Sequence, residues 1–385
     1  MYKAIVMVPL VFCMLFSSLL FAQANASKGS ASKDSVIENR IIKGELAWEQ
    51  VATVSGIPWG MTFVDNRRLL ISLKQGELQL LDTQSGQLTP VSGAPAVLLD
   101  GQGGLLDVAI GPNFAQDAWV YFTYAMQDKG QATTALGRGQ LVDRAITQWQ
   151  TLLVTQAYSS TGVHFGSRIA FDDKGHVFFS VGERGVRKNA QNRLNHAGSI
   201  LRLNLDGSVP ADNPFVGDAA ALDEIWSYGH RNPQGVYFDT LTAELWSVEH
   251  GPRGGDELNL IKKGANYGWP LVSHGKEYWG PIAVGDGTQM AGVESPVKVY
   301  IPSIAPSFLQ RYRGAAIPDW QGDFLIGALA LQHLNKLRLQ DGRVIHETRY
   351  LEALEQRVRS IAINATGQVY IGVDTGVIYR LRVTE

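Results

Sequence analysis

The hydrophobic positions of this chain fall in short runs rather than in long periodic segments. Runs rich in aliphatic and aromatic residues occupy positions 69–72, 78–81, 119–124, 177–181, 245–248, 324–327 and 369–373. Such runs are typical of β-strands, and from Ala47 onward the chain shows almost no apolar spacing at the helical period. The pattern predicts an all-β fold.

A weak internal repeat predicts how these strands are arranged. An apolar strand, an Asp/Asn/Gly turn, a strand rich in aromatic residues and a strand with basic or polar residues recur six times. The units begin at 60–65, 106–113, 169–175, 235–239, 307–310 and 361–367. The spacing is roughly 50 to 60 residues, the size of a four-stranded blade plus a loop. We therefore predict a six-bladed β-propeller.

Length and charge are consistent with this architecture. The chain has 385 residues, more than the roughly 250 to 300 at which one simple core stops growing. A ring of sheets solves this problem because its core is divided among the interfaces between blades. A pair of β-sandwiches would need a central linker, which the sequence lacks. The net charge of −2 and the absence of a Lys/Arg stripe argue against a nucleic-acid partner.

The N-terminus has the pattern of a secretory signal. Lys3 precedes an apolar run over 4–21, and small residues follow at Ala22, Ala24 and Ala26, as at an A-x-A cleavage site. We expect residues 1–24 to be a signal peptide, 25–44 a flexible leader and 45–385 the propeller domain. A membrane anchor is the alternative, because the run is about long enough to span a bilayer.

The single cysteine, Cys13, lies inside the expected signal peptide. The mature chain would then contain no thiol, which excludes disulfides, thiolate metal sites and cysteine nucleophiles. Export without disulfides favours a bacterial periplasm.

One stretch, 247–270, carries the strongest indication of a metal site. A glycine- and proline-rich loop over 251–255 precedes the carboxylates Asp256 and Glu257, and a turn follows at 264–268. Glycines let the backbone approach a ligand closely with its carbonyls turned outward. Calcium takes carbonyl and carboxylate oxygens as ligands. The alternative is a surface turn with solvated charges.

Three further motifs accompany this stretch: GGLLD at 103–107, HFGSR at 164–168 and GHRNPQG at 229–235. Together the four segments resemble the soluble aldose sugar dehydrogenases, the quinoprotein family that also includes soluble glucose dehydrogenase and the sorbosone dehydrogenase-like proteins. The resemblance extends over roughly residues 51–382. It implies a six-bladed propeller that binds pyrroloquinoline quinone (PQQ) and calcium.

The resemblance also implies catalytic roles. His164 occupies the position of the general base, and Glu183 that of its acidic partner, where the glucose-oxidising members have aspartate. An imidazole can accept a proton from a sugar hydroxyl near neutral pH. Arg231 matches the arginine beside the C5 carbonyl of PQQ, where negative charge develops. A structural histidine and an arginine in a surface turn are the alternatives.

Further residues match cofactor and metal positions. Arg357 and Arg359 are two residues apart, hence on one face of a strand, and guanidinium groups match carboxylates, of which PQQ has three. The other implied cofactor contacts are Gln102, Asn232, Ser307 and Ser273. The carbonyls of Gly251 and Pro252 match the ligands of the calcium that bridges to PQQ. Glu257 and the backbone of Tyr267 match a second calcium position.

One departure from the family concerns the cofactor. The glucose-oxidising members have a lysine that reaches PQQ from the fifth blade, and the best alignment puts Ala330 there. Lys336, Gln332 and His333 are the nearby candidates to replace it. The loss of a cation affects the expected affinity for PQQ or its reduction potential.

The sequence therefore predicts a periplasmic PQQ- and calcium-dependent dehydrogenase that oxidises the C1 hydroxyl of an aldose to the lactone. Its partners would be the sugar and an external electron acceptor, such as an artificial dye, a quinone or a cytochrome, without nucleic acid or stable membrane insertion. Trp59, Tyr278 and Trp279 are candidates to stack on a pyranose ring. A calcium-dependent propeller lactonase and a non-catalytic binding propeller remain alternatives.

Overall fold

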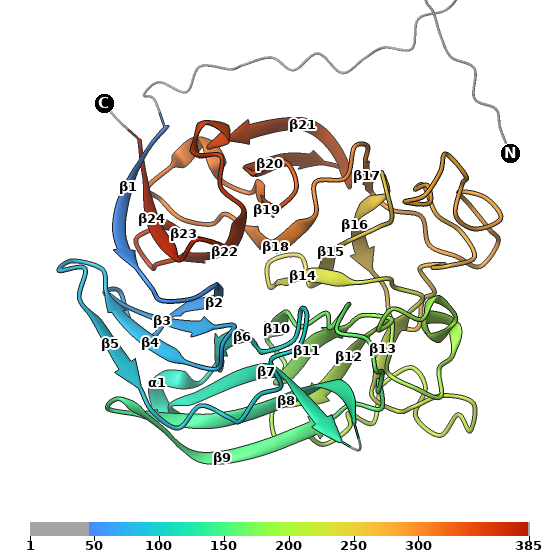
Figure 1. Cartoon of the computed structure of the whole chain (residues 1–385), viewed down its shortest axis with the longest axis horizontal. Coiled ribbons are helices and arrows are strands. Elements are labelled where there is room, and N and C mark those ends of the chain that lie inside the picture. The colour runs from blue at the N-terminus through green and yellow to red at the C-terminus, as the bar shows by residue number, and fades with distance from the viewer. Residues whose placement is uncertain (1–45, 129, 384–385) are drawn as a thin grey trace, which may run out of the picture. The chain divides into compact units, whose positions relative to one another are not determined.

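Antiparallel sheets of four strands surround a central axis in the described part of the chain (Figure 1). The computed structural model describes residues 46–128 and 130–383, all within a unit that spans Asn39–Glu385. These residues contain 24 strands in six sheets. The predicted all-β, six-bladed β-propeller is confirmed.

The first three complete sheets follow one another along the chain. One contains β2 (Pro58–Phe63), β3 (Arg68–Leu73), β4 (Leu78–Asp82) and β5 (Leu88–Val91). The next contains β6 (Leu105–Ile110), β7 (Trp119–Asp128), β8 (Gln131–Val142) and β9 (Ala145–Val154). The third contains β10 (Ile169–Phe171), β11 (His176–Val181), β12 (Ser199–Asn204) and β13 (Ile225–Tyr228).

The remaining sheets complete the ring. The fourth contains β14 (Pro233–Asp239), β15 (Glu244–Glu249), β16 (Asp256–Ile261) and β17 (Lys298–Tyr300). The fifth contains β18 (Pro306–Arg311), β19 (Phe324–Ala328), β20 (His333–Gln340) and β21 (Arg343–Tyr350). The last combines β22 (Val358–Ile363), β23 (Val369–Val373) and β24 (Val377–Val383) with β1 (Leu46–Thr53).

Helical structure in the described residues is limited to short turns. They are α1 (Phe114–Asp117) and the 3₁₀ segments η1 (Arg187–Gln191), η2 (Pro318–Trp320) and η3 (Glu352–Leu354). No helix in this part of the chain has the length and apolarity needed to cross a membrane. The predicted signal peptide (1–24) and leader (25–44) lie outside the described residues.

Pairing between the two ends of the chain closes the ring. β1 lies antiparallel to β24, with Leu46 opposite Val383 and Gln50 opposite Tyr379. The innermost strands of the sheets are β2, β6, β10, β14, β18 and β22, and each contacts the next, with β22 contacting β2 (Figure 1). The six repeats found in the sequence begin on these innermost strands.

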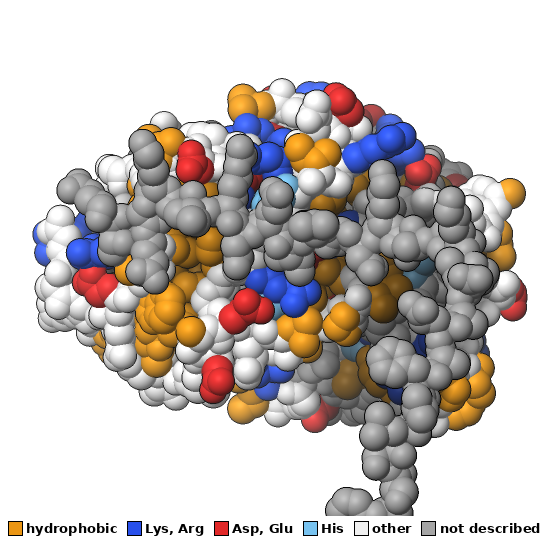
Figure 2. All heavy atoms as spheres, turned by 90° about the horizontal axis from the view of Figure 1, so that it is seen from above, with side chains coloured by type: hydrophobic (Ala, Val, Ile, Leu, Met, Phe, Trp, Pro, Cys, Tyr) orange, Lys and Arg blue, Asp and Glu red, His pale blue; other side chains and the backbone are white. Residues whose placement is uncertain are grey.

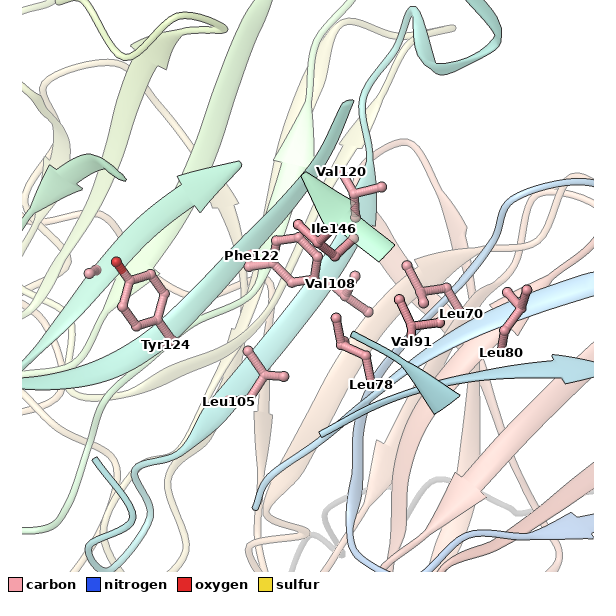
Figure 3. Packing of buried hydrophobic residues seen from close by; sticks show 11 residues of the cluster. Leu70, Leu78, Leu80, Val91, Leu105, Val108, Val120, Phe122, Tyr124 and Ile146 are labelled. Carbon is pink, nitrogen blue, oxygen red and sulfur yellow. The ribbon is translucent and has the colours of Figure 1, made fainter. Parts of the chain in front are cut away.

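The apolar core is divided among the interfaces between neighbouring sheets. In Figure 3, Leu70, Leu78 and Val91 of one sheet pack against Val108 and Phe122 of the next. Each such side chain stabilises the fold by about 1.5–3 kcal/mol through removal of apolar surface from water. Stability is therefore distributed around the ring.

A buried arginine joins the six innermost strands at the centre. Arg168 directly precedes β10, and its guanidinium donates 2.8–3.2 Å hydrogen bonds to acceptors from all five other sheets. The acceptors are the carbonyls of Trp59, Gln234, Ser307 and Arg359 and the carboxylate of Asp107. This residue therefore holds the innermost strands of the other five sheets together at the centre of the ring.

The part of the surface visible in Figure 2 carries basic and acidic side chains in mixture, without a large area of one sign. This distribution agrees with the near-zero net charge of the sequence.

Candidate active site

Loops from every sheet meet at one end of the ring. The innermost strand of each sheet runs antiparallel to the second strand, so the start of the first and the end of the second lie together. Residues 102, 164, 231 and 357 precede innermost strands, whereas residues 74, 183, 250 and 374 follow second strands. Topology therefore gathers these positions, from distant parts of the sequence, around one end of the channel. We call this end the mouth.

His164 and Glu183 form a hydrogen-bonded pair at the mouth. His164 has a left-handed backbone (φ 55°), and its N–H donates to Oε1 of Gln102 over 2.8 Å. Its Nδ1 lies 2.8 Å from Oε2 of Glu183, a carboxylate only 2% exposed. Because a carboxylate only accepts, Nδ1 carries the proton in the neutral ring and Nε2 keeps a free lone pair. The arrangement is that of an oriented general base.

Arg184 holds the loop that carries His164. Its guanidinium donates to the carbonyls of Val163 and Thr161 and packs 3.5 Å from the centre of the Phe165 ring. The side chain is fully buried, and burial lowers the pKa of Arg184 to about 10. Sequence analysis did not identify this residue, because its partners are recognisable only in the folded loop.

Arg231 and Asn232 lie between the histidine pair and the calcium candidate loop. The carbonyl of Arg231 accepts from the backbone N–H of Glu183 over 2.9 Å, and its guanidinium Nη1 donates to the carbonyl of His250 over 3.1 Å. Oδ1 of Asn232 accepts from Gly166, but its buried Nδ2 has no hydrogen-bond partner among the described residues. A buried donor left free at a functional mouth is evidence for a ligand that accepts from it.

Arg357 and Arg359 share one carboxylate. Arg359 Nε and Arg357 Nε lie 2.7 and 2.6 Å from the two oxygens of Asp374, which follows β23. The Arg359 guanidinium also lies 4.5 Å from the centre of the Trp59 ring. The two arginines thus lie side by side and Asp374 orients both of them, although Arg357 precedes β22 and only Arg359 lies within that strand. No motif around Asp374 predicts this role.

His250 connects Arg231, which donates to its carbonyl, with Pro306 at the start of β18. Its Nε2 donates to the carbonyl of Pro306 over 2.8 Å. Burial lowers the pKa of His250 to about 3, and the nearby charges of Arg231, His164 and Arg359 contribute. The contacts of His250 with Arg231 and with Pro306 place it at the mouth beside the start of β18. Sequence analysis assigned no role to His250.

The calcium candidates surround a small cavity of about 20 Å³. Its lining includes Gly251, Pro252, Glu257 and Tyr267, together with Glu249. This volume suffices for one water molecule or a single ion. No group of three or more His, Cys, Asp or Glu side chains within the described ranges is arranged to hold a metal, so backbone oxygens would have to complete the ligand set.

Two carboxylates face one another beside this cavity. Glu249 on β15 is the cross-strand partner of Glu257 on β16. Burial, and next the charge of Glu249, raise the pKa of Glu257 to about 8. Asn259 donates to both carboxylates, at 3.1 and 3.2 Å, but supplies no positive charge. A divalent cation would relieve the repulsion, so the donor set fits calcium.

Neighbouring residues shape the cavity in other ways. Asp256 accepts from the N–H groups of Gly251 and Ala305, at 2.9 and 2.7 Å, and so anchors the loop rather than facing the cavity. The Tyr267 hydroxyl donates to the carbonyl of Leu260 and accepts from Lys262 N–H. Only the backbone of Tyr267 is therefore available as a ligand.

Ser227, His230 and Glu249 form a second histidine network. His230 Nε2 lies 2.9 Å from Ser227 Oγ, and Nδ1 lies 2.9 Å from Glu249 Oε1. The order of groups resembles a hydrolase triad, but Ser227 and His230 are both 0% exposed. A substrate cannot reach this serine, so the network serves to position Glu249.

Three sequence candidates, Ser307, Trp59 and Lys336, occupy places that differ from the expectation. The Ser307 hydroxyl is buried and donates to the carbonyl of Val358, although Ser273 does line the small cavity. Trp59 is 5% exposed beneath Arg359, which leaves it no free face for a sugar. Lys336 is buried in an ion pair with Asp323 at 2.7 Å, so it does not replace the cation missing at Ala330.

The fold and the mouth together define a β-propeller whose mouth combines an oriented histidine, a pair of arginines and an oxygen-rich loop. A model of the glucose/sorbosone dehydrogenase family matches residues 55–380. The chain is 40% identical over 322 residues to aldose sugar dehydrogenase YliI of Escherichia coli, covering 82% of this chain and 87% of that protein. The chain belongs to the glucose/sorbosone dehydrogenase family.

Solved structures agree with this assignment. The apo-form of the soluble aldose sugar dehydrogenase of Escherichia coli superposes with a TM-score of 0.84 at 37% identity, over 88% of this chain and 99% of that chain. The PQQ-bound form of the aldose sugar dehydrogenase of Streptomyces coelicolor has a TM-score of 0.73 at 25% identity, with coverage of 88% and 99%.

Proposed function

We propose that this protein is a periplasmic, PQQ- and calcium-dependent dehydrogenase that oxidises the C1 hydroxyl of aldose sugars to lactones. The observation that carries the proposal is the convergence, at one mouth, of an oriented base (His164), a fixed cation (Arg231) and a pair of arginines (Arg357 and Arg359). The PQQ-bound relative supports the cofactor.

The residues present fit this cofactor. Arg357 and Arg359 would hold carboxylates, and the free Nδ2 of Asn232 would donate to an oxygen or nitrogen of the ring system. Gln102 would contribute from the loop that also binds the His164 backbone. When bound, PQQ supplies the acceptor for the hydride that leaves the sugar, and this hydride carries both electrons of the oxidation.

The proposed role of His164 is to accept one proton from the sugar. His164 Nε2, whose tautomer is set by Glu183, takes the proton of the sugar hydroxyl, and the buried carboxylate stabilises the resulting imidazolium. Arg231 presents a permanent positive charge where negative charge develops during the reaction.

Calcium would bind in the cavity beside Gly251 and Pro252 and between Glu249 and Glu257. There it would lower the cost of gathering carboxylates and carbonyl oxygens in one place. Periplasmic localisation rests on the N-terminal pattern over 3–26. The two electrons released per sugar must then pass to an external acceptor such as a quinone or a cytochrome.

Reconstitution tests the proposal directly. Purified protein with PQQ and calcium should reduce an artificial dye in the presence of at least one member of a panel of aldoses. H164A should bind PQQ with unchanged affinity yet turn over far more slowly than the wild type. Absence of any change in PQQ absorbance on mixing with the wild-type protein would refute the proposal.

A further inference from the structure

Lys74 lies at the mouth, where neither the motifs nor the family resemblance assigned it a role. It directly follows β3, in the sheet β2–β5, and so occupies the same end of the ring as His164. Its backbone is fixed on both sides: N–H donates to the carbonyl of Ile57, and its carbonyl accepts from Leu105 N–H. The position of this side chain is therefore set by the sheet rather than by a loose loop.

The Lys74 ammonium touches the loop of a predicted cofactor residue. Nζ donates to the carbonyl of Gly101 over 2.6 Å, and Gly101 directly precedes Gln102. An ammonium has three donors, and this is the single hydrogen bond that its side chain makes with the described residues. The remaining donors are available to a ligand.

The charge around Lys74 favours an anion. Lys74, Arg357 and Arg359 provide three cations, whereas Asp374 is the carboxylate ion-paired with the two arginines. Burial lowers the pKa of Lys74, and the charge of Arg359 lowers it further, with Asp374 and Asp100 opposing. The three cations exceed the two carboxylates Asp374 and Asp100 by one charge, so a bound carboxylate would stabilise the group.

In the fifth sheet, β18–β21, Ala330 stands at the position where the family resemblance leads us to expect a lysine. Ala330 is exposed and adjoins Leu329, whose carbonyl accepts from Arg357 Nη1 over 3.2 Å. Position 330 therefore lies beside the arginine pair. Lys336 does not reach the mouth, because Asp323 binds it inside the sheet.

We propose that Lys74 is a carboxylate-binding residue of the cofactor site, which supplies from the sheet β2–β5 the positive charge that a lysine at position 330 would supply from β18–β21. The ligand class is a planar polycarboxylate. The inference rests on the proposed function, since PQQ is the polycarboxylate concerned. Lys74, Arg357 and Arg359 then form one anion subsite, with Asp374 orienting the arginines.

Equilibrium titration of PQQ, in calcium and at several salt concentrations, tests this. K74M removes the charge and keeps an apolar side chain, and should raise the dissociation constant of PQQ about tenfold, the effect of losing one charged hydrogen bond. The salt dependence of binding should become weaker, because one cation is lost. K74M/A330K should recover affinity to within about threefold of the wild type.

The matched control is K174M, which removes an exposed lysine in the turn between β10 and β11, at the opposite end of β10 from His164. It should change neither affinity nor salt dependence. Thermal unfolding of each variant checks the fold. If K74M lowers the melting temperature but binds PQQ with wild-type affinity and salt dependence, Lys74 is a structural residue and the inference is wrong.

The two proposals fail in different ways. Failure of the wild-type protein to bind PQQ would overturn the proposed function, and the role of Lys74 with it. Tight binding by the wild type with no effect of K74M, or no recovery in K74M/A330K, would overturn the role of Lys74 alone.

Discussion

The guanidinium of Arg168 donates to the carboxylate of Asp107 over 2.9 Å at the centre of the ring, where both side chains are buried. Oδ2 of Asp107 accepts in turn from the N–H of Ile169. Because the same guanidinium reaches carbonyls of four further sheets, this pair ties the innermost strands at one point. This contact also anchors strands that lead to the mouth, because the carbonyls of Ser307 and Arg359 are among the acceptors of the Arg168 guanidinium.

Removal of this central cation should destabilise the whole ring. R168M leaves Asp107 as a buried, unpaired charge and several carbonyls without a donor, so the free energy of unfolding should fall by at least about 3 kcal/mol. R168K keeps the charge but lacks the planar set of five donors, and should recover only part of the loss. Urea unfolding followed by circular dichroism measures both.

The control is R67M, which breaks the surface ion pair of Arg67 with Asp82. Exposed pairs contribute little to stability, so R67M should unfold as the wild type does. Equal behaviour of R168M and R67M would show that the central network is dispensable.

The pair of His164 and Glu183 should govern turnover and not cofactor binding. H164A removes the base and should lower kcat by about 10²–10⁴-fold. E183Q keeps the shape but removes the charge that stabilises the imidazolium, and should lower kcat by about tenfold or more. Dye reduction under saturating sugar gives kcat, and PQQ titration gives the dissociation constant. A fall in PQQ affinity equal to the fall in kcat would assign these residues to binding instead.

The fold could be predicted from the sequence because each blade repeats its own local pattern. All seven apolar runs lie within strands, and the six repeats begin on the innermost strands. The pairing of β1 with β24 was not predicted, because it depends on ring closure between residues more than 300 positions apart, such as Glu49 and Arg380.

Site residues could be predicted only where the side chain by itself indicates proton transfer or the binding of an anion. His164, Arg231 and the arginine pair carry such chemistry. The role of Asp374 was not predicted, because an aspartate in a turn can orient two arginines only once the folded chain brings them into contact with it. Trp59 was interpreted wrongly for the same reason, since Arg359, 300 residues later, covers its ring. Contacts between sheets decide these roles, and spacing along the chain does not reveal them.

The substitution E257Q should stabilise the protein without calcium and should weaken the stabilisation that calcium provides. At pH 9, above the raised pKa of Glu257 (about 8), the Glu257 carboxylate of metal-free protein is charged and repels Glu249 across the strands, so E257Q should raise the melting temperature. With calcium at 100 times its dissociation constant, the wild type should gain about 2.7 kcal/mol, and E257Q should gain less. Differential scanning calorimetry with and without a chelator measures both effects.

E244Q provides the control for calcium, because Glu244 begins the strand that Glu249 ends. Its response to calcium should match the wild type. Destabilisation of E257Q in both conditions would assign Glu257 a purely structural role and contradict the metal site.

The carboxylate of Asp374 should make stability depend on acid pH. Burial would raise the pKa of Asp374, but the hydrogen bonds and charges of Arg359 and Arg357 outweigh it and hold the pKa below 3.8. Since the folded pKa lies below the unfolded value, this stabilisation is complete above pH 3.8 and is lost as the pH falls through the folded pKa. D374N should therefore cost about 2 kcal/mol at pH 7, less than a fully buried pair because Arg357 is 46% exposed. Chemical unfolding from pH 7 down to pH 2 should show a constant difference in the free energy of unfolding between D374N and the wild type above pH 5, and this difference should narrow as the pH falls below 3.8. A difference that does not narrow between pH 5 and pH 2 would mean that the amide fails for steric reasons and that the charge of Asp374 does not orient the two arginines.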